Sequence, residues 1–193
     1  MQDFKNERTC VIIKPDGVKR GLIGEIIRRF EQRGLKIVAL SMIWATKDQI
    51  DNHYPKDESW ITRLGEKTLD TYRKYNIDPI KELGTDDPYK IGIQVREWLL
   101  DYMTSGPIVK MVVEGIHAVD MVRKIVGASV PAKAEMGTIR GDFSVDSPAV
   151  ANREKRAIKN LIHASETFEE AKHEIEFWFG PEEIFNYKRD DEI

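Results

Sequence analysis

The stretch Thr9-Cys10-Val11-Ile12-Ile13-Lys14-Pro15-Asp16-Gly17 passes from a short, apolar, β-rich run into a turn that contains both proline and glycine. Between Leu22 and Phe30 the apolar side chains then recur at helical spacing, and Gly34 ends this pattern. The chain is therefore predicted to begin with a strand, a turn and a helix.

The rest of the chain continues this alternation. Two further apolar runs, Leu35 to Trp44 and Ile108 to Val113, are predicted strands, and a fourth predicted strand ends at His163. Helices are predicted over 47–54, over 118–126 and after Thr167-Phe168-Glu169-Glu170, which has capping-box spacing. The order strand, helix, strand, strand, helix, strand is typical of a ferredoxin-like fold. We expect an α+β, ferredoxin-like βαββαβ domain, with helices packed on one face of a four-stranded antiparallel sheet.

Two segments do not fit this frame. Ser59 to Tyr89 is charged and punctuated by glycine and proline, and Ser144 to Lys159 begins Ser-Val-Asp-Ser-Pro and continues as a charged helical stretch. Both are interpreted as insertions, at about 59–89 and 144–159, within a single domain that covers residues 1–193. The first is expected to form a mobile surface flap beside the functional site.

Composition narrows the class of protein. Hydrophobic residues make up 41% and charged residues 33% of the 193 residues, as in a soluble globular protein. The formal net charge of −3 argues against a general nucleic-acid binder, which carries a basic excess. Cys10 is the single cysteine, so no intramolecular disulfide is possible, and its apolar neighbours predict a buried thiol. No apolar stretch has the length of a signal peptide or a membrane span, which predicts a cytoplasmic protein without a membrane partner.

Several residues could carry phosphate chemistry. The P-loop pattern and the protein-kinase loops are absent, so such a protein would need side-chain cations and its own nucleophile. His163 ends a predicted strand, where an imidazole can act as nucleophile, base or ligand. Lys14 and Arg140 lie at predicted turns, and Arg123 lies beside the apolar face of its helix. Taken singly, each of these cations is better explained as a solvated or salt-bridged side chain.

Several motifs taken together are more specific than any one cation. They are Lys14 to Val18 (Lys-Pro-Asp-Gly-Val), Gly24 to Glu31, His53-Tyr54, Ser105-Gly106-Pro107, Gly137 to Phe143 (Gly-Thr-Ile-Arg-Gly-Asp-Phe) and Asn160 to Glu166 (Asn-Leu-Ile-His-Ala-Ser-Glu). This set resembles the nucleoside diphosphate kinase family over the whole chain except the two insertions and the polar ends. The second insertion resembles that of archaeal members. Glu166 stands where the family usually has aspartate, and Ser129 where many members have threonine.

The resemblance implies a role for each matching residue. His163 is similar to the catalytic nucleophile that accepts the γ-phosphoryl group. The implied nucleotide-binding residues are Lys14, Trp60, Arg123, Ser129, Arg140 and Asn160, of which Asn160 and Lys14 match the pair that contacts the ribose hydroxyl. The implied supporting residues are Tyr54 and Glu174, which match the residues that hold the histidine, and Ser165. For Trp60, stacking on the base and anchoring the insertion both stay open. His53, His117 and His173 are not expected to be phosphorylated.

The implied function is a nucleoside diphosphate kinase, an enzyme that transfers the γ-phosphate of ATP to nucleoside diphosphates by a ping-pong mechanism through phosphohistidine. The implied cofactor is Mg²⁺, held mainly by the nucleotide phosphates, without protein ligands. The implied assembly is a homo-oligomer, a hexamer before a tetramer. One alternative is a non-catalytic nucleotide-binding or regulatory module on the same fold, which the intact His163, Lys14 and Asn160 argue against. A ferredoxin-like RNA binder is a third class, but its aromatic RNP1 pattern is missing.

Overall fold

The computed structural model describes residues 4–190 of the chain. The chain forms two compact units. One is made of residues 1–44, 106–144 and 160–193, and the other of residues 45–105 and 145–159. The first unit contains the sheet, and the second is helical and includes both predicted insertions. The single-domain arrangement stays a prediction.

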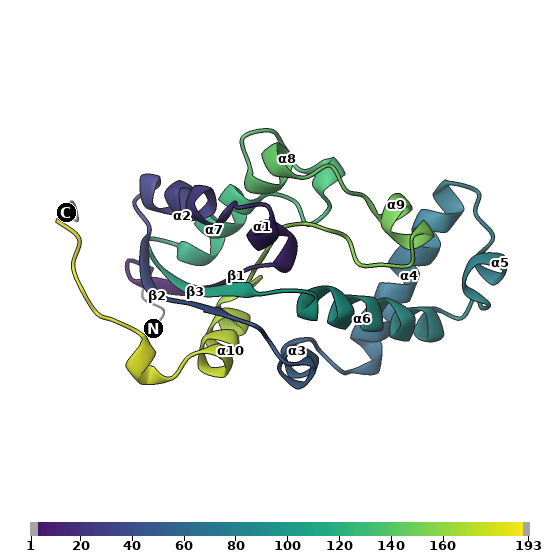
Figure 1. The fold of residues 1–193 in the computed structure, drawn as a ribbon, viewed down its shortest axis with the longest axis horizontal. Helices are drawn as coiled ribbons and strands as arrows, with labels where there is room; N and C mark the ends of the chain where they lie inside the picture. Colours follow the sequence, from purple (N-terminus) through teal and green to yellow (C-terminus); the bar gives the residue numbers. More distant parts are fainter. Residues whose placement is uncertain (1–3, 191–193) are drawn as a thin grey trace. The chain divides into compact units, whose positions relative to one another are not determined.

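The first unit is built on a four-stranded sheet of order β2-β3-β1-β4, drawn in Figure 1. Its strands are β1 (Glu7–Ile13), β2 (Lys36–Ile43), β3 (Ile108–Gly115) and β4 (Ile162–Ala164). All neighbouring strands are antiparallel, which confirms the predicted ferredoxin-like fold. In the register, Ile12 on β1 lies between Lys110 on β3 and His163 on β4, so the central strand β1 fixes the position of the histidine.

The apolar core lies on one face of the sheet. Because side chains alternate along a strand, Val11 and Met111 point to the same face, where they meet Phe30 and Val122. The helices on this face are α2 (Ile23–Gln32) and α7 (Ala118–Val126), accompanied by the short helices α1 (Pro15–Lys19) and α8 (Ile139–Phe143) and the 3₁₀ turn η1 (Pro131–Lys133). The helix predicted over 118–126 is thus confirmed at both ends.

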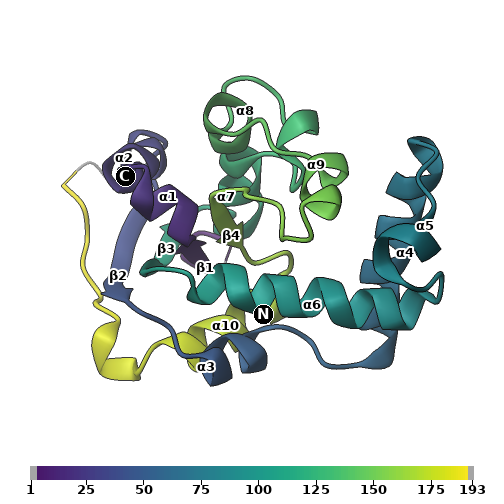
Figure 2. The ribbon, with the colours of Figure 1, turned by 45° about the vertical axis from the view of Figure 1, so that its right-hand side comes forward.

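The second face is covered too, so the expectation of helices on one face only is wrong. Helix α10 (Phe168–Trp178) lies on the opposite side of the sheet from α2 and α7 (Figure 2). The Lys110 ammonium donates to the Trp178 carbonyl, and the Cys10 N–H donates to the Ser165 hydroxyl oxygen at 3.3 Å. The turn η2 (Pro181–Glu183) and the segment after it follow, and the Phe185 N–H donates to the Val38 carbonyl on the edge strand β2.

The second unit consists of helices packed on one another. They are α3 (Lys47–His53), α4 (Glu58–Lys74), α5 (Pro79–Leu83), α6 (Pro88–Thr104) and α9 (Pro148–Arg153). The interpretation of 59–89 as turn-rich is wrong, because a 17-residue helix occupies about half of it and contacts α6 and α9. Its buried residues Ile61, Gly65, Thr68 and Tyr72 follow helical spacing. The flap beside the functional site stays a prediction.

Gly65 was misinterpreted as a sign of a turn, whereas Gly84 does end helix α5 in a left-handed conformation. A Cβ on Gly65 would lie 1.8 Å from the Pro88 carbonyl oxygen, and one on Gly92 would lie 1.9 Å from the Ile61 carbonyl oxygen. The two helix backbones therefore meet at a pair of glycines, and the glycines serve close packing. Within residues 4–190, no helix is both long and apolar enough to cross a membrane.

Candidate active site

The segment after β1 and the segment before β4 are joined by backbone contacts. The Lys14 N–H donates to the Leu161 carbonyl at 2.8 Å, and the Leu161 N–H donates to Oδ2 of Asp16 at 3.1 Å. A Cβ on Gly17 would lie 3.0 Å from the Leu161 carbonyl oxygen, so a side chain there would crowd this contact. The predicted turn at Lys14-Pro15-Asp16-Gly17 is in fact the start of helix α1. Proline suits this position because its missing N–H is not needed in the first turn.

His163 lies on β4, and its imidazole is held by a carboxylate on α10. Nε2 of His163 lies 2.7 and 2.9 Å from the two carboxylate oxygens of Glu174. Since a carboxylate only accepts, Nε2 carries a proton and donates it. The Ser165 hydroxyl donates to the same carboxylate at 2.6 Å, and both Ser165 and Glu174 are buried. The imidazole keeps 19% of its side-chain surface exposed, so a reactant has access to it. His163 and Glu174 therefore lie where the resemblance placed them, and their functional roles stay predictions.

Lys14 is buried rather than emerging from the end of the sheet, with 7% of its surface exposed. Its ammonium donates to Oδ1 of Asn160 at 2.8 Å, and Nδ2 of Asn160 donates to the Ser129 carbonyl at 2.8 Å. Burial, reinforced by the charge of Arg140 and opposed by that of Asp16, lowers the pKa of Lys14 from 10.5 to about 7. The lysine is therefore close to half-protonated near neutral pH.

Arg140 lies on the short helix α8, not at a turn, and its guanidinium is buried. It donates three hydrogen bonds to backbone carbonyls: Nε to Asn160 at 3.1 Å, Nη1 to Gly127 at 2.8 Å and Nη2 to Ile162 at 2.6 Å. The planar fork of arginine suits such a set of acceptors. Arg140 thus ties the chain just before His163 to the end of α7, a structural contact that the sequence did not reveal.

The other predicted phosphate contacts are more exposed. Arg123, in the last turn of α7, lies 3.4 Å from Oε1 of Glu166. Glu166 is the residue that replaces the usual aspartate of the motif. The side chain of Ser129 is exposed on the loop after α7. Hydrogen bonds thus link Lys14, Arg140, Asn160 and the Ser129 backbone in one network.

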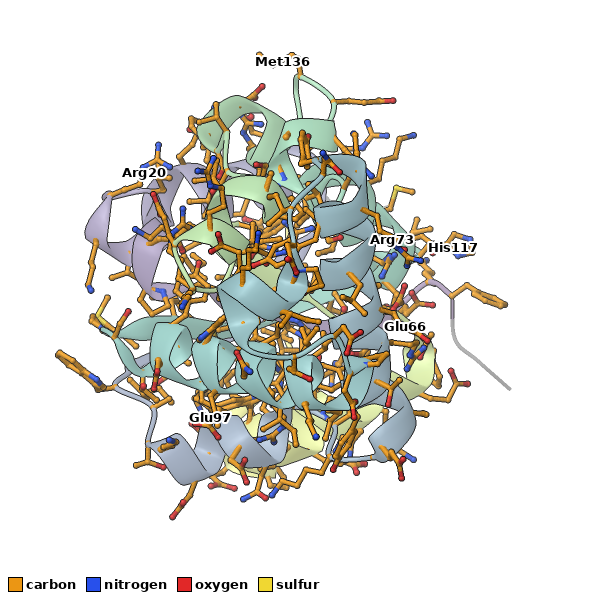
Figure 3. The ribbon with its side chains drawn as sticks, turned by 90° about the vertical axis from the view of Figure 1, so that its right-hand side faces the viewer. Arg20, Glu66, Arg73, Glu97, His117 and Met136 are labelled. Atoms are coloured by element: carbon orange, nitrogen blue, oxygen red, sulfur yellow. The ribbon has the colours of Figure 1, made fainter. Side chains whose placement is uncertain are left out.

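Tyr54 and Trp60 belong to the helical unit. Their rings stack with centroids 6.0 Å apart and an interplanar angle of 26°. The roles implied for Tyr54 and Trp60 stay predictions. His117 and His173 are exposed as expected, and His117 is labelled in Figure 3.

One network near the site was missed from the sequence. Arg29 on α2 donates to Glu25 at 3.0 Å, to Asp142 at 2.6 Å and to the Gly137 carbonyl at 3.1 Å. These contacts fasten helix α8, which carries Arg140, and the Gly137 residue before it onto α2. Glu25 and Arg29 have the i,i+4 spacing of a helical ion pair, which was a usable signal. Nothing in the local sequence indicated that Asp142 would join them.

The chain was compared with known proteins. A sequence model described as Nucleoside diphosphate kinase matches residues 7–61 and 93–184, which is well over half of the chain. The chain belongs to the nucleoside diphosphate kinase family. The unmatched residues between the two parts fall within the helical unit and largely coincide with the predicted insertion at 59–89.

Members of the nucleoside diphosphate kinase family resemble the chain over nearly its full length. A nucleoside diphosphate kinase from Pyrobaculum aerophilum is 52% identical over 178 residues, which cover 92% of this chain and 97% of that protein. A crystal structure of an NDP kinase from the same organism superposes with a TM-score of 0.91 at 49% identity, and covers 94% of this chain and 100% of that one.

A second solved structure is that of the nucleoside-diphosphate kinase from Borrelia burgdorferi, described as a transition-state mimic with bound vanadate and ADP. It has a TM-score of 0.78 at 36% identity, and covers 98% of this chain and 96% of that one. Family membership therefore rests on sequence and on fold alike.

Proposed function

We propose that this member of the nucleoside diphosphate kinase family transfers the γ-phosphoryl group of ATP to nucleoside diphosphates through a phosphohistidine at His163. The observation that carries the proposal is the buried Glu174 carboxylate on Nε2 of an accessible imidazole. With the proton on Nε2, the lone pair of the neutral ring lies on Nδ1, and Nδ1 is therefore the attacking atom.

The first half of the reaction forms a bond between Nδ1 of His163 and the γ-phosphorus, while the bond from that phosphorus to the β–γ bridging oxygen breaks and ADP leaves. As the ring develops positive charge, the carboxylate of Glu174 stabilises it through Nε2–H. In the second half a nucleoside diphosphate attacks the phosphohistidine, the N–P bond breaks and a nucleoside triphosphate leaves. One site serves donor and acceptor because the two halves are the same reaction in opposite directions.

The cations act on the phosphates. We propose that Lys14, Arg123 and Arg140 contact phosphate oxygens, with Ser129 as a hydroxyl donor. Fixed positive charge in a partly buried site stabilises a transferring phosphoryl group without reorganisation. Asn160, which accepts from the Lys14 ammonium, would contact the ribose together with it. Tyr54 is proposed to support the histidine, and Trp60 to stack on the base.

Mg²⁺ fits this site as an ion that arrives with the nucleotide. The carboxylates that contact the histidine segment are already engaged, Glu174 by His163 and Ser165, and Asp16 by the Leu161 N–H. We propose that the ion is held mainly by the nucleotide phosphates. Bound there, it would neutralise charge on the β- and γ-phosphates.

For the assembly we propose a homo-oligomer, with a hexamer expected before a tetramer, acting in the cytoplasm where ATP and nucleoside diphosphates are present. The nucleotide specificity is proposed to be broad, because sugar and phosphates are held by hydrogen bonds while the base only stacks.

The decisive experiment uses γ-labelled ATP and the full chain. Wild type should form an acid-labile, base-stable phosphoenzyme that is discharged by nucleoside diphosphates, whereas His163→Ala should form none. His117→Ala and His173→Ala, at exposed positions, should label like wild type. Labelling of a folded His163→Ala would contradict the mechanism. ADP binding by wild type without phosphoenzyme would favour the alternative of a non-catalytic nucleotide-binding module.

A further inference from the structure

The residue two positions before His163 has an unusual backbone conformation. Leu161 has a φ of 69°, in the left-handed region that a branched apolar residue rarely adopts. The Ile162 N–H donates to the Asn160 carbonyl at 2.8 Å, so these residues form a γ-turn centred on Leu161. Leu161 is fully buried, and the turn sets the direction in which the chain enters β4.

Both backbone groups of Leu161 are held by the segment at the start of α1. Its carbonyl accepts from the Lys14 N–H at 2.8 Å, and its N–H donates to Oδ2 of Asp16 at 3.1 Å. The first of these bonds is made by backbone, so every residue type except proline at position 14 could form it. The second depends on the side chain of Asp16.

We propose that Asp16 is a positioning residue for phosphoryl transfer: its carboxylate holds the Leu161 turn and thereby keeps His163 in the orientation from which it attacks. This inference rests on the proposed role of His163. A left-handed conformation is unfavourable for a residue with a Cβ, so without the Asp16 bond the turn would relax towards other conformations. A shift of about 1 Å in a reacting group can reduce a rate by roughly 100-fold.

Asp16 also acts on Lys14, and this second effect has to be separated from the first. The charge of Asp16 raises the pKa of Lys14, against the larger effects of burial and Arg140. Removing that charge would therefore weaken nucleotide binding whether or not the turn moves. Charge and hydrogen bond can be separated, because asparagine keeps a side-chain oxygen for the Leu161 N–H but has no charge, and alanine has neither.

The test compares wild type, Asp16→Asn and Asp16→Ala as full chains by three measurements. These are the ADP affinity, the single-turnover rate of His163 phosphorylation at saturating ATP and Mg²⁺, and the hydrogen exchange rate of the Leu161 amide. ADP affinity should fall alike in both variants. The saturating rate should fall at least about tenfold in Asp16→Ala and stay within about threefold of wild type in Asp16→Asn. Only Asp16→Ala should show faster exchange at Leu161.

Asp48→Ala, which removes an exposed acid from the first turn of α3, is the control and should match wild type throughout.

Equal saturating rates in wild type and Asp16→Ala would overturn the inference, and so would an equal loss of rate in both Asp16 variants. If Asp16→Ala does not fold, Asp16→Ser takes its place, because its neutral side chain is too short to reach the Leu161 N–H. Failure of the proposed function itself is recognised separately, since wild type would then form no phosphohistidine.

Discussion

Lys14 and Arg140, the two buried cations of the site, are joined through Asn160. The Lys14 ammonium donates to the side-chain oxygen of Asn160 at 2.8 Å, and Nε of Arg140 donates to its backbone oxygen at 3.1 Å. The two positive charges thus lie close to each other and to the histidine segment, and Arg140 contributes to the low pKa of Lys14. An anionic ligand would relieve this repulsion, which makes the site sensitive to pH.

The first prediction concerns this pH dependence. With the pKa of Lys14 near 7 in the free protein, the amine is largely neutral above that pH, whereas a bound phosphate favours the ammonium. ADP binding should therefore take up about one proton at pH values above 7, and the affinity should weaken as the pH rises, by at most about tenfold per unit. Calorimetry in buffers of different ionisation enthalpy measures the proton uptake. Lys14→Met should bind ADP more weakly and without this uptake; wild-type binding with no proton uptake above pH 7 would contradict the prediction.

The second prediction concerns Glu174. Glu174→Ala removes the acceptor of both the imidazole and the Ser165 hydroxyl, and a hydrogen bond to a charged group contributes about 1.5–3 kcal/mol. The single-turnover phosphorylation rate should drop about 10- to 100-fold, while ADP affinity changes little because Glu174 points at the ring. Glu176→Ala, on the exposed side of the same helix, is the matched control and should leave the rate unchanged. A folded Glu174→Ala with the wild-type rate would show that the carboxylate does not orient the histidine.

The third prediction separates the two arginines. Arg140→Ala removes three hydrogen bonds to backbone carbonyls and should lower the free energy of unfolding by at least about 2 kcal/mol, in addition to reducing transfer. Arg123→Ala, at an exposed position, should reduce transfer about tenfold or more with little change in stability. Arg140→Lys should recover little of either property, because an ammonium cannot match the planar fork. Denaturant unfolding measures the stability of each variant, and transfer assays measure its activity. Equal stability of the two alanine variants would contradict the prediction.

The fourth prediction concerns the helical unit. Gly65→Ala places a methyl group 1.8 Å from the Pro88 carbonyl oxygen, so α4 and α6 must move apart, at an expected cost of about 1–3 kcal/mol. Gly24→Ala is the control, because nothing lies within 4 Å of a Cβ on this helical glycine, and alanine should be neutral or stabilising there. Thermal unfolding measures both. A Gly65→Ala chain as stable as the Gly24→Ala chain would show that the helices can separate freely.

Local pattern predicted most of the sheet unit. The helix Ala118–Val126 was predicted at both ends, because its apolar spacing and flanking residues are local signals. The capping box at Thr167 was predicted only in part. The Thr167 hydroxyl accepts from the Glu170 N–H at 3.1 Å, as expected. The Glu170 carboxylate, however, accepts from the backbone N–H of Glu166 and does not complete the capping box. The segment 59–89 was misinterpreted because glycine and proline were taken as loop signals. Gly65 instead lies at the close crossing of α4 and α6, which is a tertiary contact, and Pro79 and Pro88 begin the helices α5 and α6.

The sequence by itself determined the order of the strands and longer helices of the sheet unit and the chemical groups at the site, because periodicity and motif spacing depend on near neighbours along the chain. Only the tertiary structure decided how those groups are used. Asp16 meets the Leu161 N–H across 145 positions of sequence, and Arg140 finds its carbonyls on two different segments. The burial that lowers the pKa of Lys14 likewise exists only once β1, β4 and α8 are packed together, since desolvation is a property of the folded surroundings and not of the residue.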